Sequence, residues 1–330
     1  MRKVFSFVFS LGLFSLLISC SESKVGTKNR PFAMYFIPSV DAQKLTNVSA
    51  EMAKFVSKYV SQKIYNKDEG FYVKSSVPTS YIAVVEAFGT KKADFATFST
   101  FAYILTRDIK KYPIEALVLT KRANGEKTYK GQIIARADSG IKSLADLKGK
   151  TFAYTDASST SGFILPSKML KDQGIQVKNS VFALKHDNVV TMVYQKQVDA
   201  GATYYSSPET VEVNGKKTSK ITDARARVKT QFPDVEEKVK VIGYTEEIPN
   251  EPWVIRSNLF ADPQENEKVK GYVFEALEAY AASPEGKKAI DELAGATGIE
   301  RVTDAAYDKI REVIIANKDL NLEETVKKGK

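Results

Sequence analysis

The sequence has very few of the side chains that most often carry catalytic or metal chemistry. Its 330 residues include one histidine, His186, and one cysteine, Cys20. A single cysteine excludes an intrachain disulfide, and one histidine with one cysteine cannot build the usual zinc site. Gly149-Lys150-Thr151 ends like a P-loop, but leucine stands where that motif needs its first glycine. The composition therefore indicates neither a metal nor another cofactor.

Long apolar runs are also missing, except at the N-terminus. Two basic residues precede the apolar stretch Val4–Ile18, which is too short for a membrane-spanning helix and typical of a signal peptide. The following Leu-Ile-Ser-Cys is similar to the bacterial lipobox, whose cysteine is lipidated; the alternative is a plain signal peptide with an incidental cysteine. We expect a signal peptide at 1–19 and a lipidated Cys20 with a flexible tether over 20–30. The protein would then be exported and anchored to a bacterial membrane, facing the periplasm or the cell exterior.

No block of like charge occurs. The net charge of +9 at pH 7 becomes +7 once Arg2 and Lys3 leave with the signal peptide. A modest positive excess suits an anionic ligand or a membrane surface. Because no basic-aromatic recognition motif is present, we expect no nucleic-acid partner. The full sequence is 43% hydrophobic, and the chain that remains is long enough for two domains of roughly 150 residues each.

What the chain does have is an alternation of strand-like and helix-like segments. Apolar runs of strand length occur at 31–37, 71–74, 94–98, 132–136, 150–154 and 239–244. Between them, Met52, Val56 and Val60 form part of a helical stripe that Asn47 or Ser49 could cap. Such alternation predicts mostly parallel sheets covered by helices. The strands at 132–136 and 239–244 are candidates for the crossings between two lobes.

Two segments show the same order of features. Residues 84–97 and 192–203 each read as a helix, a basic turn and a strand with an Ala-Asp or Val-Asp step. One βαβ unit used twice would give two similar lobes. Coincidence is the alternative, because junctions of this kind share their composition.

The most informative local segment is the hydroxyl-rich turn Asp156–Gly162. It lies between the strand 150–154 and a helix that ends near Gly174. The first amides of a helix lack backbone partners and carry partial positive charge, so this geometry suits an anion. Hydroxyls add donors, and Gly162 would let a ligand come close. The alternative is an ordinary helix N-cap. Pro166 is expected to bend the helix after its first turns.

Several motifs together resemble the phosphate-, phosphonate- and phosphite-binding lipoproteins of ABC transporters, the phosphonate-binding periplasmic family. The residues that carry the resemblance are Tyr81 within 80–87, Asp94 with the turn 98–103, Tyr129 before 131–134, 158–162 with Pro166, His186-Asp187, and Ile248-Pro249-Asn250-Glu251-Pro252-Trp253. The resemblance implies an α/β fold of the type II periplasmic-binding class. Two α/β lobes with mixed, mostly parallel sheets would be joined by two crossing strands. We place lobe I at 31–130 plus 242–330 and lobe II at 131–241.

The resemblance also implies a set of ligand-binding residues between the lobes. They are Ser159, Thr160, Ser161, His186, Tyr81, Tyr129 and Glu251. A charged His186 would strengthen anion binding as the pH falls through its pKa, although it could equally be a satisfied core or surface histidine. Glu251 could accept an ammonium group or a P–OH proton, or be a surface acid of the hinge. The absence of a second acid in 203–207 argues against an aminophosphonate ligand.

The resemblance implies a solute-binding lipoprotein of an ABC importer and no enzymatic activity. It would capture a small phosphorus oxyanion as a monomer and deliver it to separate permease and ATPase subunits. One alternative is a ligand-sensing lipoprotein that acts on a membrane sensor kinase, which the neighbouring genes would distinguish. A phosphoester hydrolase using Ser159, His186 and Asp187 is a further alternative, but adjacent residues are poorly placed for one to orient the other.

Overall fold

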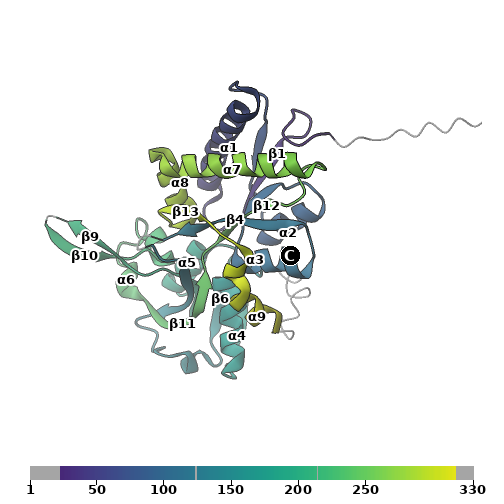
Figure 1. The fold of residues 1–330 in the computed structure, drawn as a ribbon. Helices are drawn as coiled ribbons and strands as arrows, with labels where there is room; N and C mark the ends of the chain where they lie inside the picture. Colours follow the sequence, from purple (N-terminus) through teal and green to yellow (C-terminus); the bar gives the residue numbers. More distant parts are fainter. Residues whose placement is uncertain (1–22, 123–124, 214, 317–330) are drawn as a thin grey trace, which may run out of the picture.

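The structure is a computed structural model and describes residues 23–122, 125–213 and 215–316. The predicted signal peptide, Cys20 and the charged tail at 323–330 lie outside these residues. Within them, no helix combines the length and the apolar composition needed to cross a membrane. The fold has two mixed β-sheets, each flanked by helices (Figure 1).

The first sheet has six strands in the order β13-β4-β12-β3-β1-β2. Their bounds are β1 Phe32–Phe36, β2 Val73–Ser76, β3 Phe95–Thr97, β4 Ile114–Lys121, β12 Pro252–Arg256 and β13 Gly298–Arg301. Helices α1 and α7 lie together over this sheet (Figure 1). The α1 side chains Met52, Val56 and Val60 are completely buried, which confirms the predicted apolar stripe.

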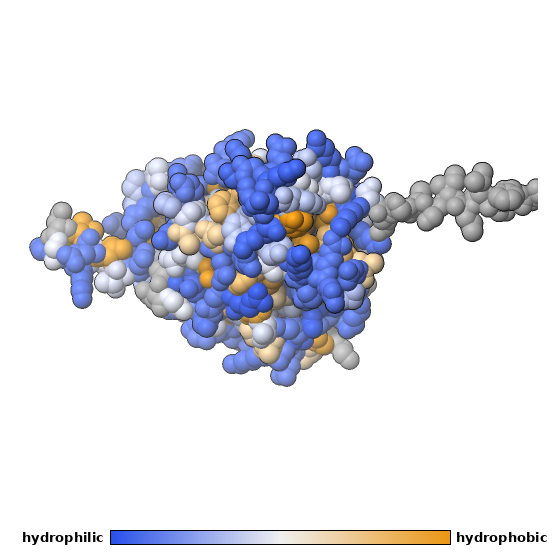
Figure 2. Space-filling model, turned by 45° about the horizontal axis from the view of Figure 1, so that its top comes forward, coloured by the Kyte–Doolittle hydropathy of each residue, from blue (hydrophilic) through white to orange (hydrophobic). Residues whose placement is uncertain are grey.

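The second sheet has five strands in the order β11-β5-β8-β6-β7. Their bounds are β5 Thr128–Arg136, β6 Thr151–Tyr154, β7 Asn179–Phe182, β8 Ala200–Tyr205 and β11 Val239–Pro249. A separate hairpin, β9 Glu209–Val213 with β10 Lys216–Lys220, stands away from the body (Figures 1 and 2). All the residues of β10 are polar and exposed, so this ribbon forms in solvent without an apolar face to bury.

Nine α-helices are found in the described ranges 23–122, 125–213 and 215–316. They are α1 Ala42–Tyr65, α2 Tyr81–Gly89, α3 Thr100–Ile104, α4 Leu165–Asp172, α5 His186–Tyr194, α6 Val235–Lys238, α7 Pro263–Ala282, α8 Pro284–Ala294 and α9 Asp308–Ala316. Helix α1 begins earlier than predicted, because the Asp41 carboxylate accepts from the Lys44 amide at 3.0 Å and caps it there. Neither Asn47 nor Ser49 is the cap.

One topological unit occurs in both sheets. In β1-α1-β2-α2-β3 and in β6-α4-β7-α5-β8, the first strand lies between the other two and pairs parallel with both. A lysine in the left-handed region follows the second helix of each unit: Lys91 at φ 56° and Lys196 at φ 63°. The internal similarity in the sequence therefore reflects a repeated βαβαβ unit rather than coincidence.

The sheets are mixed, and most of their strands run in the same direction, as expected. Neighbouring strands pair parallel within the two repeated units. Strands β4, β12, β13, β5 and β11 are joined to their neighbours by antiparallel pairs. By direction, β1, β2, β3 and β4 run together in the first sheet, and β6, β7, β8 and β11 run together in the second.

The chain passes from the first sheet to the second between Lys121 and Thr128, and returns between Pro249 and Pro252. The two passages are hydrogen-bonded to each other, since the Asn250 amide donates to the Lys127 carbonyl at 2.9 Å. Strand β11 stays in the second sheet until Pro249. The lobe limits of 130/131 and 241/242 remain a prediction. The chain changes sheet shortly before the first limit, whereas the second limit falls inside β11, before the return at 249–252.

The described part of the predicted tether packs against the first sheet. The Tyr72 amide donates to the Gly26 carbonyl at 2.7 Å, and the Arg30 guanidinium lies 2.7 Å from the completely buried Asp94 carboxylate. These contacts explain Asp94 as a structural residue. They also shorten any flexible segment, because residues 26–30 belong to the folded body.

Candidate ligand-binding site

A small cavity lies between the two sheets, where the parallel strands of both repeated units end. Ser39 follows β1, whereas Ser159 and Ser161 follow β6. Tyr81 and His186 are the first residues of α2 and α5, so they occupy equivalent positions in the two units. Ligands of open α/β sheets bind outside the carboxyl ends of strands, and this cavity has that position.

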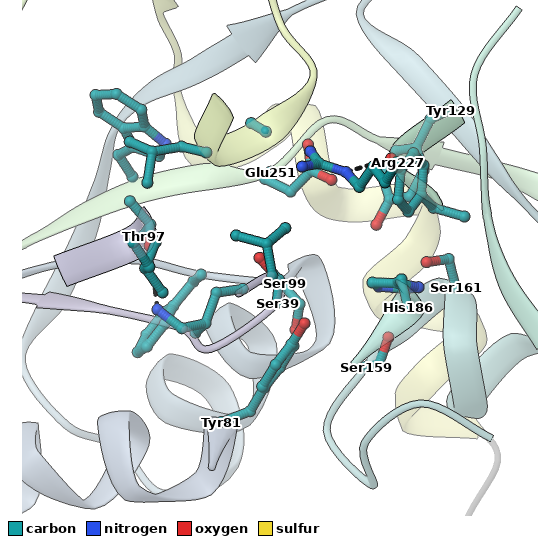
Figure 3. A pocket seen from close by; sticks show the side chains of 18 of the residues that line it. Ser39, Tyr81, Thr97, Ser99, Tyr129, Ser159, Ser161, His186, Arg227 and Glu251 are labelled. Carbon is teal, nitrogen blue, oxygen red and sulfur yellow. Dashed lines mark hydrogen bonds between the residues drawn. The ribbon is translucent and has the colours of Figure 1, made fainter. Parts of the chain in front are cut away.

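The side chains approach the cavity from both lobes (Figure 3). Ser159, Ser161 and His186 lie on one side, and Ser39, Ser99 and Tyr81 lie on the other. The full set that lines the cavity is Ile37, Ser39, Val40, Leu45, Tyr81, Thr97, Phe98, Ser99, Arg122, Tyr129, Ser159, Ser161, His186, Tyr204, Arg227, Glu251, Trp253, Leu293 and Ala294. All the predicted site residues except Thr160 are in this set.

The hydroxyl-rich turn leads into a π-helical turn, Thr160–Ile164, which continues directly into α4. Ser159 is its N-cap: the hydroxyl oxygen accepts from the Gly162 amide at 3.1 Å. Ser159 also lines the cavity, so the N-cap and the anion-site interpretations are compatible. Pro166 lies at the start of α4, where its missing N–H costs little. Pro166 lies just after the π-helical turn passes into the α-helix α4, and it does not bend a longer helix.

Thr160 faces the other lobe. Its hydroxyl oxygen accepts from the Phe101 amide at the start of α3, at 2.8 Å. In return, the Ser99 hydroxyl donates to the Ser158 carbonyl at 2.8 Å. The Asp156 carboxylate accepts from the backbone amide of Tyr81, and burial raises the pKa of this acid. The turn of the second lobe thus caps two helices of the first, α2 and α3.

Gly162 is required by packing, not by the approach of a ligand. A Cβ atom at this position would lie 2.2 Å from the Thr155 Oγ1 atom and 2.9 Å from the Ser159 Oγ atom. The expectation that Gly162 makes room for the anion was therefore wrong. Its role is to let the turn lie flat against the end of β6.

His186 is buried, with 6% of its surface exposed. Its Nδ1 atom lies 2.8 Å from the Thr203 hydroxyl and 3.3 Å from that of Thr155. Burial, with smaller contributions from Arg227 and Arg122, lowers the pKa of His186 to about 3. In the empty site the imidazole is therefore neutral near pH 7, and charging on acidification begins well below its ordinary pKa of 6.5.

Two buried phenols complete the polar wall. Tyr81 interacts with Ser39, and Tyr129 interacts with Ser161 and Thr160 through their side chains. Burial, reinforced by nearby acids, raises the pKa of Tyr81 and of Tyr129 well above the ordinary value. Both phenols therefore keep their protons at physiological pH and can donate to an anion.

Glu251 is held by an arginine that the sequence analysis did not identify. The Arg122 Nη2 atom lies 2.8 Å from both carboxylate oxygens, and the Thr120 hydroxyl donates to the same group at 3.0 Å. Arg122 also lies over the Tyr129 ring, 5.2 Å from its centroid. Both acceptor atoms of Glu251 are thus already engaged within the protein.

A second arginine in the wall, Arg227, donates from Nε to the Tyr204 hydroxyl at 2.7 Å. The Tyr204 ring packs edge-on against His186, with centroids 5.0 Å apart. Neither arginine belongs to a motif, and they reach the cavity from distant segments, so no local pattern indicated them. Ser39 could have been identified, because, like Ser159, it lies in the loop that follows a predicted strand.

The arrangement needed for hydrolysis is not assembled. The Nδ1 atom of His186 contacts two threonine hydroxyls rather than Asp187, and the Ser159 hydroxyl accepts a backbone hydrogen bond. Among the side chains that the structure describes, no three His, Cys, Asp or Glu residues gather as a metal-binding group. The cavity offers hydroxyl, phenol, imidazole and guanidinium groups, a donor set suited to binding an anion.

Comparisons with known proteins agree with this donor set. Residues 34–307 match the model of a family described as "ABC transporter, phosphonate, periplasmic substrate-binding protein". The chain is 30% identical over 155 residues to the phosphate-import protein PhnD of Mycolicibacterium smegmatis, aligning 43% of this chain with 48% of that one. It is 25% identical over 231 residues to the phosphonates-binding periplasmic protein of Escherichia coli, aligning 69% with 62%. The chain thus spans between about half and two thirds of the length of these relatives.

The fold also matches a solved structure. The structure of PhnD1 from Prochlorococcus marinus in complex with methylphosphonate superimposes with a TM-score of 0.68 at 19% identity, covering 91% of this chain and 99% of that one. This likeness confirms the periplasmic-binding-protein fold, and the family model extends over both sheets and the cavity between them. The family consists of binding proteins rather than enzymes, as expected from the sequence. The chain belongs to the phosphonate-binding periplasmic protein family of ABC transporters.

Proposed function

We propose that this protein is the solute-binding lipoprotein of an ABC importer for a small phosphorus oxyanion. It would close its two lobes around a phosphonate, phosphite or phosphate ion and deliver it to separate permease and ATPase subunits. The observation that carries the proposal is the position of Ser159 and Ser161, at a helical N-terminus in the wall of a buried inter-lobe cavity.

The chemistry of the wall supports an oxyanion. Hydroxyl donors from Ser159 and Ser161 face phenol donors from Tyr81 and Tyr129, and His186 lies between the serines in Figure 3. Hydrogen bonds to a charged acceptor contribute about 1.5–3 kcal/mol each. Three or four of them would hold a tetrahedral anion firmly in a site that excludes water. Arg227 adds a positive charge to the wall.

The remaining two predicted residues have different roles in this proposal. Thr160 acts on closure, because its hydroxyl joins the second lobe to α3 of the first. Glu251 belongs to the wall, where Arg122 neutralises it. The cavity volume of about 60 Å³ is several times the roughly 10–15 Å³ that a cavity needs to hold one water molecule. A ligand of this size has a handful of heavy atoms, like an inorganic or short-chain phosphorus oxyanion.

The lipid anchor rests on the sequence around Cys20. We propose that Cys20 is lipidated after removal of residues 1–19, which keeps the folded body next to the permease. Cell fractionation is expected to find the wild type with membranes and a Cys20→Ser variant in the soluble exported fraction. Equal membrane association of both proteins would contradict the anchor.

The binding site can be tested by thermal shift with phosphate, phosphite and methylphosphonate. At least one should raise the melting temperature, because a ligand that binds only the folded state stabilises it. Ser159→Ala should weaken that ligand about tenfold or more, since one anion oxygen loses its donor. Ser167→Ala is the matched control: its hydroxyl bonds to the Ile164 carbonyl outside the cavity. Equal affinities of the two variants would argue against the site.

A further inference from the structure

Glu251 is the only acid among the described residues that line the cavity. A carboxylate in such a wall repels an anion and attracts any ammonium group that the ligand carries. Whether Glu251 repels an anion or binds an ammonium depends on the protein groups that already bind its carboxylate. The most important of these groups is Arg122.

Arg122 is fixed and almost fully buried, with 3% of its surface exposed. One end of its guanidinium donates to both oxygens of Glu251 at 2.8 Å, and the other donates to the Ala294 carbonyl at the end of α8. The Tyr129 ring lies beneath the guanidinium. These contacts come from the returning inter-lobe passage, from β5 and from α8, so the arginine has little freedom to release Glu251.

The rest of the wall carries no second acid among the described residues. Val40, Leu45, Leu293 and Trp253 supply hydrocarbon, and the serine and threonine hydroxyls are neutral. Arg227 is also in the wall and is bonded to a phenol, Tyr204. A ligand substituent thus meets hydrocarbon, neutral hydroxyls and a guanidinium, with no free carboxylate.

We propose that Arg122 is a specificity-determining residue that selects phosphonates with an uncharged substituent. By pairing with Glu251, it neutralises the only carboxylate among the described residues of the wall. This inference rests on the proposed function and adds the charge class of the ligand to it. Without Arg122, a partly buried carboxylate without its ion pair would face the cavity, and a cationic substituent would be its best available partner.

Two ligands of equal size separate the possibilities. Propylphosphonate and 2-aminoethylphosphonate have the same number of heavy atoms and differ by a methyl against an ammonium group. By calorimetry, the wild type should bind propylphosphonate at least tenfold more tightly. In Arg122→Met, the ratio of the two affinities should move at least tenfold toward the amine.

Substitution of Glu251 completes a double-mutant cycle with Arg122→Met, and substitution of Arg225 provides the control. Arg122→Met/Glu251→Gln should restore the wild-type preference, because neither charge remains. Glu251→Gln alone leaves Arg122 unneutralised, so it should bind propylphosphonate more tightly than the wild type does. Arg225→Met is the matched control, since Arg225 pairs with the buried Asp223 at 2.7 Å and does not line the cavity. Its ratio should equal that of the wild type.

Several results would overturn the inference. Equal wild-type affinities for the two phosphonates, or an unchanged ratio in Arg122→Met, would show that Arg122 does not select the charge. If Arg122→Met fails to fold, weaker binding of propylphosphonate by Glu251→Gln would show that Glu251 itself contacts the ligand. Failure of the wild type to bind any phosphonate, phosphate or phosphite would instead remove the proposed function together with this inference.

Discussion

At the scale of single residues, His186 shows how the surroundings set the charge of a group. Its ring is enclosed by threonine hydroxyls, the Tyr204 ring and two arginines in the cavity wall. The protonated form loses its hydration and faces like charges, so its pKa falls to about 3. A bound anion would offset both effects and raise the pKa again. Binding should therefore tighten on acidification, between the raised pKa of His186 in the complex and its pKa of about 3 in the empty site.

This pKa makes a prediction about stability without ligand. Between about pH 6.5 and 3 the unfolded chain binds a proton at His186 that the folded protein does not, so stability falls as the pH falls. The loss is up to about 1.4 kcal/mol per pH unit from this one group. His186→Gln should remove that part of the slope. Urea unfolding of both proteins between pH 7.5 and 4.5 measures it, and parallel curves would show that His186 is not a buried neutral base.

Single residues also show which parts of the site can be predicted from the sequence and which cannot. Ser159, Ser161, Tyr81 and His186 could be predicted because each follows a strand or begins a helix within a recognisable motif. Arg122 could not, because its importance arises from the distance to Glu251, 129 positions away in the chain. Long-range charge pairing leaves no periodic or local signal in a single sequence.

At the scale of elements, the hydroxyl-rich turn joins the two lobes directly through its contacts with the starts of α2 and α3. Ser80, which precedes α2, makes no side-chain cap, and Asp156 of the other lobe supplies an acceptor for the Tyr81 amide instead. Thr160 does the same for Phe101 in α3. Helix starts that receive part of their capping from the opposite lobe favour the closed arrangement.

Thr160→Val tests this arrangement. The change keeps the shape but leaves the buried Phe101 amide without its acceptor, at a cost of about 1–3 kcal/mol in the closed form. Ligand affinity should fall about tenfold, and small-angle scattering of the free protein should show a larger radius of gyration than for the wild type. Thr160→Ser keeps the hydroxyl and serves as the control. An unchanged radius in Thr160→Val would mean that this bond does not hold the lobes.

Elements differ in how far their sequence determines them. The strands β1 and β6 were predicted within a residue or two, because buried apolar runs leave little choice. Two features were not predicted: the start of α1 and the β9-β10 hairpin. Asp41 caps α1 eleven residues before Met52, where the predicted apolar stripe begins, and β10 of the hairpin consists of exposed polar residues that carry no burial pattern.

At the scale of the whole molecule, two copies of one βαβαβ unit face each other across the cavity. Their equivalent helix starts carry Tyr81 and His186, and the loops after their first strands carry Ser39 and Ser159. The site is thus built from the same positions of both lobes. The two lobes and the periplasmic-binding class could be predicted from alternation and motifs. The direction of β4, β5, β11 and β12 could not, because strand composition does not tell which way a strand runs in its sheet.

We propose above all that the cavity between the lobes binds a small phosphorus oxyanion. Calorimetric titration of the protein with phosphate, phosphite and methylphosphonate tests it most directly. We predict that at least one of the three binds with a dissociation constant in the micromolar range or below and a stoichiometry of one. The absence of binding heat for all three, at protein concentrations well above micromolar and at two temperatures, would contradict it.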